Sequence, residues 1–325
     1  MKQKLNKPPY QITTQIIHLI SAIQKKLGQV EGQVITPAPL KLRKENQIRT
    51  IHHSLAIEGN SLTEEQITAI LEKKKVFGPK KQILEVQNAL LVYDQIQKTN
   101  PLKESEFLKT HKMLMSQLTE SNGRYRKSAV GVFQGTKISH LAPPAKLVPE
   151  LMTQLFYYLN HAEDSWLIKA CVFHYELEFI HPFEDGNGRM GRLWQQLLLA
   201  KESSVFSMIP VESEVHKNQK QYYKVLQSCD KNGESTLFIE FSLEMILKSM
   251  ENFFLEITPK SPTSSERIQM AASHFQKKEF SRKEYLLFHR SISTATASRD
   301  LKQAVQLQQL KRIGDKSQAK YKFHK

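Results

Sequence analysis

The segment HPFEDGNGRMGR, His181 to Arg192, constrains the fold of this 325-residue chain most, because it separates two long apolar runs. Before it, SWLIKACVFHYELEFI is apolar enough to form a buried helix. After it, apolar residues recur at the spacing of one buried helix face, at Met190, Leu193, Trp194, Leu197 and Leu198. The segment is therefore predicted to be a loop between two core helices.

Proline and glycine set the shape predicted for this loop. Pro182 disfavours helical backbone at His181, so the first helix is expected to end there. Gly186, Asn187 and Gly188 permit a sharp turn that exposes backbone N–H groups at the start of the second helix. Such a helix N-terminus binds phosphate oxygens through its unpaired donors and the positive end of the helix dipole.

The charged side chains around the turn are of the types that phosphoryl chemistry needs. Arg189 and Arg192, three residues apart on the second helix, can hold further phosphate groups. Asp185 offers a hard carboxylate ligand for Mg²⁺ beside a polyphosphate, and His181 can accept a proton from an attacking hydroxyl near neutral pH. Each of these residues alone is commonly structural or solvated. Their conjunction within one short segment is poorly explained by packing.

The same segment resembles the signature of the Fic family, HPFx(D/E)GNGRxxR, and matches it at every fixed position from His181 to Arg192. The resemblance implies a helical bundle that transfers AMP from ATP to a hydroxyl of a protein. It assigns proton abstraction to His181, Mg²⁺ to Asp185 and the ATP phosphates to the turn and its arginines. Glycine at position 188, where the related Doc kinases usually have lysine, favours nucleotidyl transfer. The nucleotide-binding residues implied within the motif are Gly186, Asn187, Gly188, Arg189, Met190, Gly191 and Arg192.

A second segment, SLAIEGN, resembles the inhibitory motif (S/T)xxxE(G/N) of the same family through Ser54, Glu58 and Gly59. Gly59 and the asparagine after it commonly end helices, so Glu58 is expected at a helix C-terminus. A carboxylate there opposes the helix dipole by about 0.3 to 1 kcal/mol, which favours a cationic partner. The resemblance supplies Arg192 as that partner. It implies an N-terminal inhibitory helix, at about residues 45–59, that blocks the productive γ-phosphate position.

The resemblance covers roughly residues 40–250. After GRYR, Gly123–Arg126, alternating apolar residues predict a short β-hairpin at about residues 130–141, called the flap here. In the family, a protein substrate docks on this flap as an added strand. The stretch HKNQKQYYKVL resembles the helix that lines the nucleotide pocket, which makes Asn218, Tyr222 and Tyr223 further nucleotide-binding candidates. Tyrosines at helical spacing are, however, more often core residues.

Composition favours helices elsewhere, with 40% hydrophobic residues and only 12 glycines. We expect an N-terminal helical region at 1–100, a catalytic core at 101–258, a linker at 259–265 and a C-terminal module at 266–325. In the first region, Thr63 and Gln66 have the capping-box pattern that starts a helix. Cys171 and Cys229 indicate neither a disulfide framework nor a zinc site. No signal-type N-terminus or membrane span is recognised, so a cytoplasmic location without membrane contact is expected.

The C-terminal module is strongly basic. Residues 260–325 hold 15 Lys and Arg against 5 Asp and Glu, a net of +10 within a formal chain charge of +15. FSRKEYLLFHR predicts a helix, SISTATASRDLKQAVQLQQL a turn and a second helix, and the basic residues around Gly314 a hairpin. This order matches a small winged helix-turn-helix domain with Thr294–Gln303 as its recognition helix. It indicates DNA or a protein as the partner.

The sequence leaves two other functions open. One is a nucleic-acid-binding regulator that acts through the C-terminal module while the core senses nucleotide. The other is an enzyme of the same fold that removes AMP, with Glu58 positioning water. Self-modification and a homodimer are further expectations from the family, whereas the sequence identifies neither the target protein nor the acceptor residue.

Overall fold

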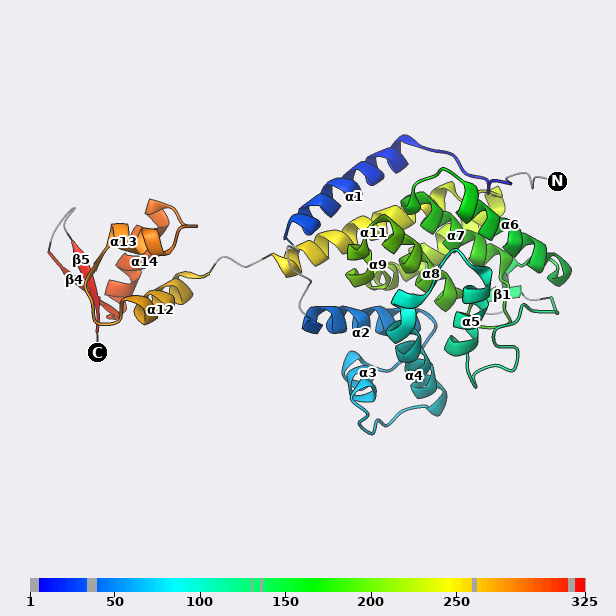
Figure 1. Cartoon of the computed structure of the whole chain (residues 1–325), viewed down its shortest axis with the longest axis horizontal. Coiled ribbons are helices and arrows are strands. Elements are labelled where there is room, and N and C mark those ends of the chain that lie inside the picture. Colours follow the sequence, from blue (N-terminus) through cyan, green and yellow to red (C-terminus); the bar gives the residue numbers. More distant parts are fainter. Residues whose placement is uncertain are drawn as a thin grey trace. The chain divides into compact units, whose positions relative to one another are not determined.

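Figure 1 shows the computed structural model of the chain, which describes residues 6–33, 40–129, 131–134, 137–258, 262–314 and 319–324. The chain divides into two compact units, Met1–Thr258 and Pro259–Lys325. Each unit has a hydrophobic core of its own. Helices dominate both units, so the expected mainly α fold is confirmed.

The first unit consists of helices and one small hairpin. Its α-helices are α1 (Thr14–Gln33), α2 (Leu40–Ile57), α3 (Glu64–Leu71), α4 (Lys80–Gln95), α5 (Glu104–Leu114), α6 (Val148–His161), α7 (Trp166–Ile180), α8 (Asn187–Glu202), α9 (Val211–Lys217), α10 (Gln219–Asn232) and α11 (Thr236–Ile257). Three short 3₁₀ segments connect them, η1 (Ile96–Lys98), η2 (Ala145–Leu147) and η3 (Ser204–Met208).

The consecutive helices α7 and α8 form the centre of this unit (Figure 1). Both are buried along most of their length, including Phe173 on α7 and Trp194 on α8. A helix that is buried on all sides is stable only when other helices enclose it. Here α6, α10 and α11 pack on α7, while α1 lies along α11 and α2 along α9. The prediction of two core helices on either side of the loop is confirmed.

Helix α2 ends at the break predicted from glycine and asparagine. Gly59 has a left-handed backbone with φ of 89°, and the Asn60 N–H donates to the Leu55 carbonyl at 3.1 Å. This hydrogen bond is the outer one of a Schellman motif, which satisfies carbonyls at a helix end. Thr63 then caps α3 in the expected capping box. Both predicted helix boundaries are confirmed, and Glu58 comes directly after α2.

Two short strands form the predicted hairpin. The strands β1 (Gly131–Gln134) and β2 (Lys137–Leu141) pair antiparallel, with Gly131 opposite Leu141. The register shifts between Val132 and Phe133. The expected flap at about residues 130–141 is therefore confirmed as a hairpin, with residues 130, 135 and 136 outside the described part of the chain.

In its described residues, the second unit combines three helices with a small sheet. Its elements are α12 (Ser264–Phe275), β3 (Phe280–Ser281), α13 (Arg282–Phe288), α14 (Thr294–Gln306), β4 (Leu310–Ile313) and β5 (Lys320–Phe323). The antiparallel strands are ordered β3-β5-β4, and the helices bury Ile268, Tyr285 and Leu301.

The start of α12 corrects the expected linker at 259–265. The helix begins at Ser264, because Thr263 and Glu266 form a capping box that starts it before the expected boundary. Helix α14 also continues to Gln306, beyond the expected end at Gln303. Across the described residues of both units, no helix has the combination of length and apolar character that crossing a membrane requires.

Candidate active site

The loop between α7 and α8 makes the sharp turn predicted from its proline and glycines. Helix α7 ends at Ile180, and His181 follows in a left-handed backbone conformation, with φ of 49° and ψ of 61°. Gly186 is also left-handed, with φ of 91°, and α8 begins at the next residue, Asn187. A β-carbon at Gly186 would lie 2.8 Å from the Met115 sulfur, so backbone conformation and space both require glycine there.

Arg126 fixes the end of α7 and the start of the loop. Its backbone N–H donates to the Pro182 carbonyl at 2.9 Å, and its Nε donates to the His181 carbonyl at 2.7 Å. Further guanidinium hydrogen bonds reach the carbonyls of Ile180 and Pro143. Carbonyls at a helix end need such partners, and Arg126 is buried. The stretch GRYR resembles the family, but nothing in the sequence indicates this role for its second arginine.

His111, on α5, holds the middle of the loop. The Gly123 N–H donates to His111 Nδ1 at 2.8 Å, so the proton of the neutral ring is on Nε2, which donates to the Asp185 carbonyl at 2.9 Å. Burial lowers the pKa of His111 to about 4 and keeps the ring neutral, as these hydrogen bonds require. Phe183 stacks on the ring with the centroids 3.5 Å apart. His111 is not recognisable from the sequence, because one histidine on an amphipathic helix carries no signal.

Asn187 closes the loop on itself. Its Nδ2 donates to the Phe183 carbonyl and its Oδ1 accepts from the Phe183 N–H, both at 2.9 Å. Asn187 and Phe183 are both buried, so the phenylalanine pins the loop to the core. A buried side-chain amide with its hydrogen bonds satisfied is rigid, so the backbone on either side of Asp185 is fixed.

Arg189 contacts the carboxylate that the sequence predicts as a metal ligand. Its Nη2 donates to Asp185 Oδ1 at 2.7 Å, and its Nη1 donates to Glu85 Oε1, on α4, at 3.4 Å. The Arg189 side chain is 6% exposed and that of Asp185 is 43% exposed. Glu85 also accepts from Asn60 Nδ2 at 2.8 Å, which connects Arg189 to the end of α2.

Arg192 contacts both residues of the segment that resembles the inhibitory motif. Its Nη2 donates to Glu58 Oε1 at 2.7 Å and to the Ser54 carbonyl at 2.9 Å, and its Nε donates to Ser54 Oγ at 3.1 Å. The Arg192 side chain is 2% exposed and that of Glu58 is 36% exposed. Burial alone would lower the pKa of Arg192, but the nearby Glu58 carboxylate outweighs it and the pKa is raised.

Gly188 leaves room for this contact. A β-carbon at Gly188 would overlap Glu58 Oε1 and come within 3.0 Å of Arg192 Nη1. Within the described part of the chain, Arg192 Nη1 is buried and has no hydrogen-bond partner. A buried charged donor without a partner costs free energy, so its place beside the glycine turn favours an anionic ligand there.

The three candidates after α8 lie in different surroundings. Asn218 is the junction between α9 and α10. Tyr222 is 1% exposed, and its hydroxyl lies 3.1 Å from Nε2 of the buried His174. Tyr223 is 39% exposed, and its hydroxyl donates to the Ile57 carbonyl, at the end of α2, at 3.3 Å. Tyr222 therefore belongs to the core and Tyr223 to the contact with α2, while a nucleotide-binding role stays a prediction for all three.

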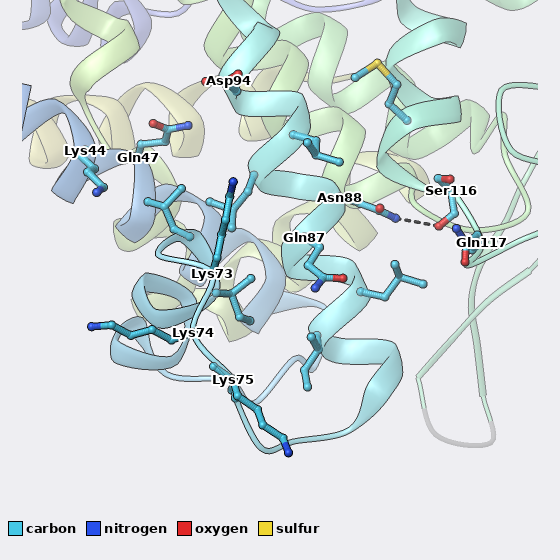
Figure 2. A pocket seen from close by; sticks show the side chains of 18 residues that line it. Lys44, Gln47, Lys73, Lys74, Lys75, Gln87, Asn88, Asp94, Ser116 and Gln117 are labelled. Carbon is cyan, nitrogen blue, oxygen red and sulfur yellow. Dashed lines mark hydrogen bonds between the residues drawn. The ribbon is translucent and has the colours of Figure 1, made fainter.

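A separate cavity of about 1260 Å³ lies among α2, α3, α4 and α5 (Figure 2). Lysines line one part of it, namely Lys44 and Lys73 to Lys75, and Asn88 crosses it to donate to the Ser116 carbonyl at 2.8 Å. None of the residues from His181 to Arg192 lines this cavity. It is therefore distinct from the loop between α7 and α8.

Known proteins resemble this chain over the same loop and beyond it. Residues 101–199 match the model of the Fic/DOC family. A Fic family protein from Desulfovibrio desulfuricans G20 with a known crystal structure is 34% identical, with 98% of each chain covered and a TM-score of 0.74.

Two curated relatives are both called protein adenylyltransferase Fic. The one from Culex quinquefasciatus is 27% identical over 244 residues, 70% of this chain and 46% of that protein. The one from Nematostella vectensis is 28% identical over 236 residues, 66% of this chain and 50% of that protein. The chain thus spans about half the length of the curated relatives it matches.

Proposed function

The chain belongs to the Fic/DOC family, and on this premise we propose that it is a protein adenylyltransferase that moves AMP from ATP to a Tyr, Ser or Thr hydroxyl of a protein. One observation carries the proposal. Among the residues that the structure describes, none pairs with Nη1 of the buried Arg192, which lies beside Gly188 of the first turn of α8. A charged donor at a helix N-terminus is an arrangement that favours phosphate oxygens.

The nucleotide phosphates would bind at the start of α8. Its N-cap residue is Gly186, which has no side chain to cap the helix, so the first backbone N–H groups can donate to a ligand. Arg189 and Arg192 extend the same site along the helix. The arrangement selects a polyanion, and the family resemblance identifies that polyanion as ATP.

Asp185 fits the Mg²⁺ that the family resemblance implies. Its carboxylate is partly exposed beside the phosphate-binding turn, and oxygen is the ligand atom that Mg²⁺ prefers. Arg189 has a second carboxylate partner in Glu85, so it keeps an ion pair when Asp185 binds a cation. When bound, Mg²⁺ would offset the negative charge that develops on the phosphates during transfer.

His181 would take the proton of the acceptor hydroxyl. Its Nδ1 lies 3.3 Å from the Glu178 carbonyl, which can only accept, so the lone pair of the neutral ring is on Nε2. As the hydroxyl oxygen forms a bond to the α-phosphorus, the bond to pyrophosphate breaks and the proton moves to Nε2. Arg126 is a positioning residue in this step, because it holds the His181 backbone.

Glu58 would inhibit this reaction by pairing with Arg192. The Glu58 carboxylate accepts from Nη2 of the guanidinium, which would otherwise bind phosphate, and Gly188 leaves space for the carboxylate there. Ser54 holds Arg192 through two further hydrogen bonds, so the arginine keeps its place whichever anion it binds. Autoinhibition is thus a competition between Glu58 and the γ-phosphate for Arg192.

The hairpin β1–β2 suits the docking of an extended target segment. Main-chain hydrogen bonds to an added strand would align a hydroxyl with His181 with little dependence on the target's side chains. The target can be another protein or a second copy of this chain, which would also allow regulation within a homodimer.

The test incubates the full chain with α-labelled ATP and Mg²⁺, in parallel with γ-labelled ATP, and follows label on the protein and on a cell lysate. We expect label from the α position alone, strongest in Glu58→Gly and absent in Glu58→Gly/His181→Ala. Glu256→Gln is the matched control, because Glu256, on α11, pairs with Arg49 of α2 at 2.7 Å and is similarly exposed.

An α label that Glu58→Gly does not raise, while ATP still binds, would contradict inhibition by Glu58. Absence of α label from every variant would favour AMP removal. In that case Glu58→Gly should abolish release of AMP from a modified protein, whereas an adenylyltransferase gains activity from the same substitution.

A second activity is favoured by the exposed basic residues of the second unit. Arg299 and Lys302 on α14, and Lys311 and Lys320 on the strands after it, are all exposed. We propose that this unit is a winged helix-turn-helix that uses α14 to bind DNA. The logarithm of the affinity of the full chain for duplex DNA should fall linearly with the logarithm of the salt concentration. The affinity should also be lower in Arg299→Ala/Lys302→Ala. Absence of salt-dependent binding would leave protein recognition as the role of this unit.

A further inference from the structure

Three histidines and a glutamate gather at the end of α2, the helix that Glu58 directly follows. His52 and His53 lie in the last turns of α2, Glu64 is the first residue of α3 and His216 lies on α9. One ligand atom each from His52, His53 and Glu64 lies within 4.8 Å of the other two. The His216 ring is 5.3 Å from the His53 ring, measured between centroids. Three elements thus converge on one small volume.

The separation of His52 and Glu64 matches that of two ligands of one metal ion. His52 Nδ1 lies 3.4 Å from Glu64 Oε1, yet this buried nitrogen makes no hydrogen bond within the described part of the chain. Bonds of 2.0 to 2.2 Å in tetrahedral geometry place two zinc ligands about 3.3 to 3.5 Å apart. His52 Nδ1 and Glu64 Oε1 are therefore as far apart as two ligands of one zinc ion, and they are not aligned to form a hydrogen bond with each other.

His53 has the outer contacts of a metal ligand. Its Nδ1 lies 2.9 Å from the Arg49 carbonyl, which can only accept, so this nitrogen carries the proton and Nε2 the lone pair. Metal-bound histidines usually donate their other ring N–H to a carbonyl or carboxylate in this way. Ser213 Oγ, on α9, lies 3.1 Å from the same Nδ1 and further restrains the ring.

We propose that His52, His53 and Glu64 form a zinc site, which the neighbouring His216 completes as the fourth ligand by a side-chain rotation. Three imidazoles and one carboxylate are ligands that Zn²⁺ accepts in a closed tetrahedral site, whereas Mg²⁺ and Ca²⁺ prefer oxygen. The bound ion would join the end of α2 to the start of α3 and to α9. It would therefore hold in place the helix turn that leads to Ser54 and Glu58.

Zinc binding is tested on the full chain after treatment with a chelator, by calorimetric titration with Zn²⁺ in excess Mg²⁺. We expect one Zn²⁺ per chain, bound at least about 100-fold more weakly by His52→Ala/Glu64→Gln/His216→Ala, because outer contacts alone change affinity roughly 10- to 100-fold. Co²⁺ bound to the wild type should show the strong visible absorption of a four-coordinate ion. Equal Zn²⁺ affinity of the triple variant and the wild type would overturn the proposal.

Two control variants distinguish loss of the zinc ligands from a general effect of substitution on folding. His161→Ala removes a histidine whose Nδ1 contacts the carbonyl four residues earlier, as His53 does, but which lies on α6 outside the cluster. It should bind Zn²⁺ like the wild type. Ser213→Ala alters only the outer contact to His53 and should weaken binding about tenfold. Loss of affinity in His161→Ala equal to that of the triple variant would contradict a site at the end of α2.

A regulatory consequence rests on the proposed function. By holding the end of α2, Zn²⁺ should lower AMP transfer by the wild type but not by Glu58→Gly. If Zn²⁺ binds but affects AMP transfer by the wild type and by Glu58→Gly equally, the regulatory role is rejected and the zinc site is retained. Absence of AMP transfer under every condition would reject the proposed function, while the calorimetric result still decides the zinc site.

Discussion

Each of the two units contains a buried arginine paired with a carboxylate, but the two pairs are built differently. In the second unit, Arg267 donates Nε to Asp300 Oδ2 at 2.6 Å and Nη2 to Oδ1 at 2.8 Å, and both side chains are at most 10% exposed. In the first unit, Arg192 contacts a single oxygen of Glu58, which is 36% exposed. The Arg267–Asp300 pair is bidentate and enclosed. The Arg192–Glu58 pair has a single hydrogen bond, and its carboxylate is open to solvent.

The difference separates a structural contact from an exchangeable one. Arg267 joins α12 to α14 and could not lose Asp300 without leaving a charge buried and unpaired. Arg192 retains two hydrogen bonds to Ser54 when Glu58 leaves, and water already reaches Glu58. An ion pair that must yield to a ligand needs this open construction, because a bidentate buried pair is too costly to separate.

The largest expected effect comes from breaking the enclosed pair. Asp300→Ala should destabilise the second unit by about 3 to 5 kcal/mol, because it leaves Arg267 buried without its partner. Both tryptophans, Trp166 and Trp194, are in the first unit, so their fluorescence reports that unit alone. Hydrogen exchange within residues 264–306 should become fast, while the fluorescence transition in urea stays unchanged. Unchanged exchange protection would show that the pair is not a structural contact.

Lowering the pH should weaken the Arg267–Asp300 pair less than Asp300→Ala does. Burial alone would raise the pKa of Asp300, but its hydrogen bonds from Arg267 outweigh burial and lower the pKa below its ordinary value of 3.8. A carboxyl group with a lowered pKa in the folded state adds stability above its unfolded pKa, and this stability is lost as the pH falls through the folded pKa. Exchange protection of α12 and α14 should therefore fall below pH 3.8. Asp300→Asn should reduce this pH dependence, and an unchanged profile would assign it to other groups.

Neutralising the open pair should change stability little. Glu58→Gln should alter the free energy of unfolding by no more than about 1 kcal/mol, because the glutamine oxygen can still accept from Arg192, which also keeps its two hydrogen bonds to Ser54. Glu256→Gln, which breaks a pair whose carboxylate is similarly exposed but whose Arg49 is 34% exposed, should have no larger an effect in the same urea titration. Only Glu58→Gln should raise AMP transfer. A loss of several kcal/mol in Glu58→Gln alone would mean that the pair is as structural as the enclosed one.

The smallest change in stability is expected from Gly188→Ala. The new methyl group displaces the Glu58 carboxylate, but alanine also favours helix by about 1 kcal/mol over glycine, so the two effects nearly cancel. Activity is measured as a double-mutant cycle, because Gly188 also belongs to the phosphate-binding turn. The activation produced by Glu58→Gly should largely disappear in the Gly188→Ala background. Full activation in that background would show that Glu58 does not lie against Gly188.

Much of the loop could be predicted from local sequence. Pro182 and Gly186 fix backbone conformations that few other residues adopt, so the end of α7, the turn and the start of α8 follow from neighbouring residues. The end of α2 and the cap of α3 are predictable for the same reason. Helix α12 begins earlier than the sequence predicts, because proline and serine before Thr263 are typical of a longer linker.

The supports of the loop could not be predicted. Arg126 and His111 contact residues more than fifty positions away in the sequence, and each would be unremarkable if its partners were elsewhere. The same is true of Glu85 beside Arg189 and of His216 beside His53. Tyr222 shows the opposite problem, since its position in a matching stretch does not reveal that its hydroxyl lies against the buried His174.

The sequence by itself determined the helical fold class, the turn between α7 and α8 and the identity of the residues that meet there. These depend on backbone preferences and on the order of side chains along one helix, both of which are local. Tertiary structure alone decided which arginine pair is enclosed and which is open, and where His52, His53 and Glu64 converge. Burial and hydrogen-bond partners depend on how distant helices pack, and that packing sets whether a charge is fixed in place or can exchange its partner.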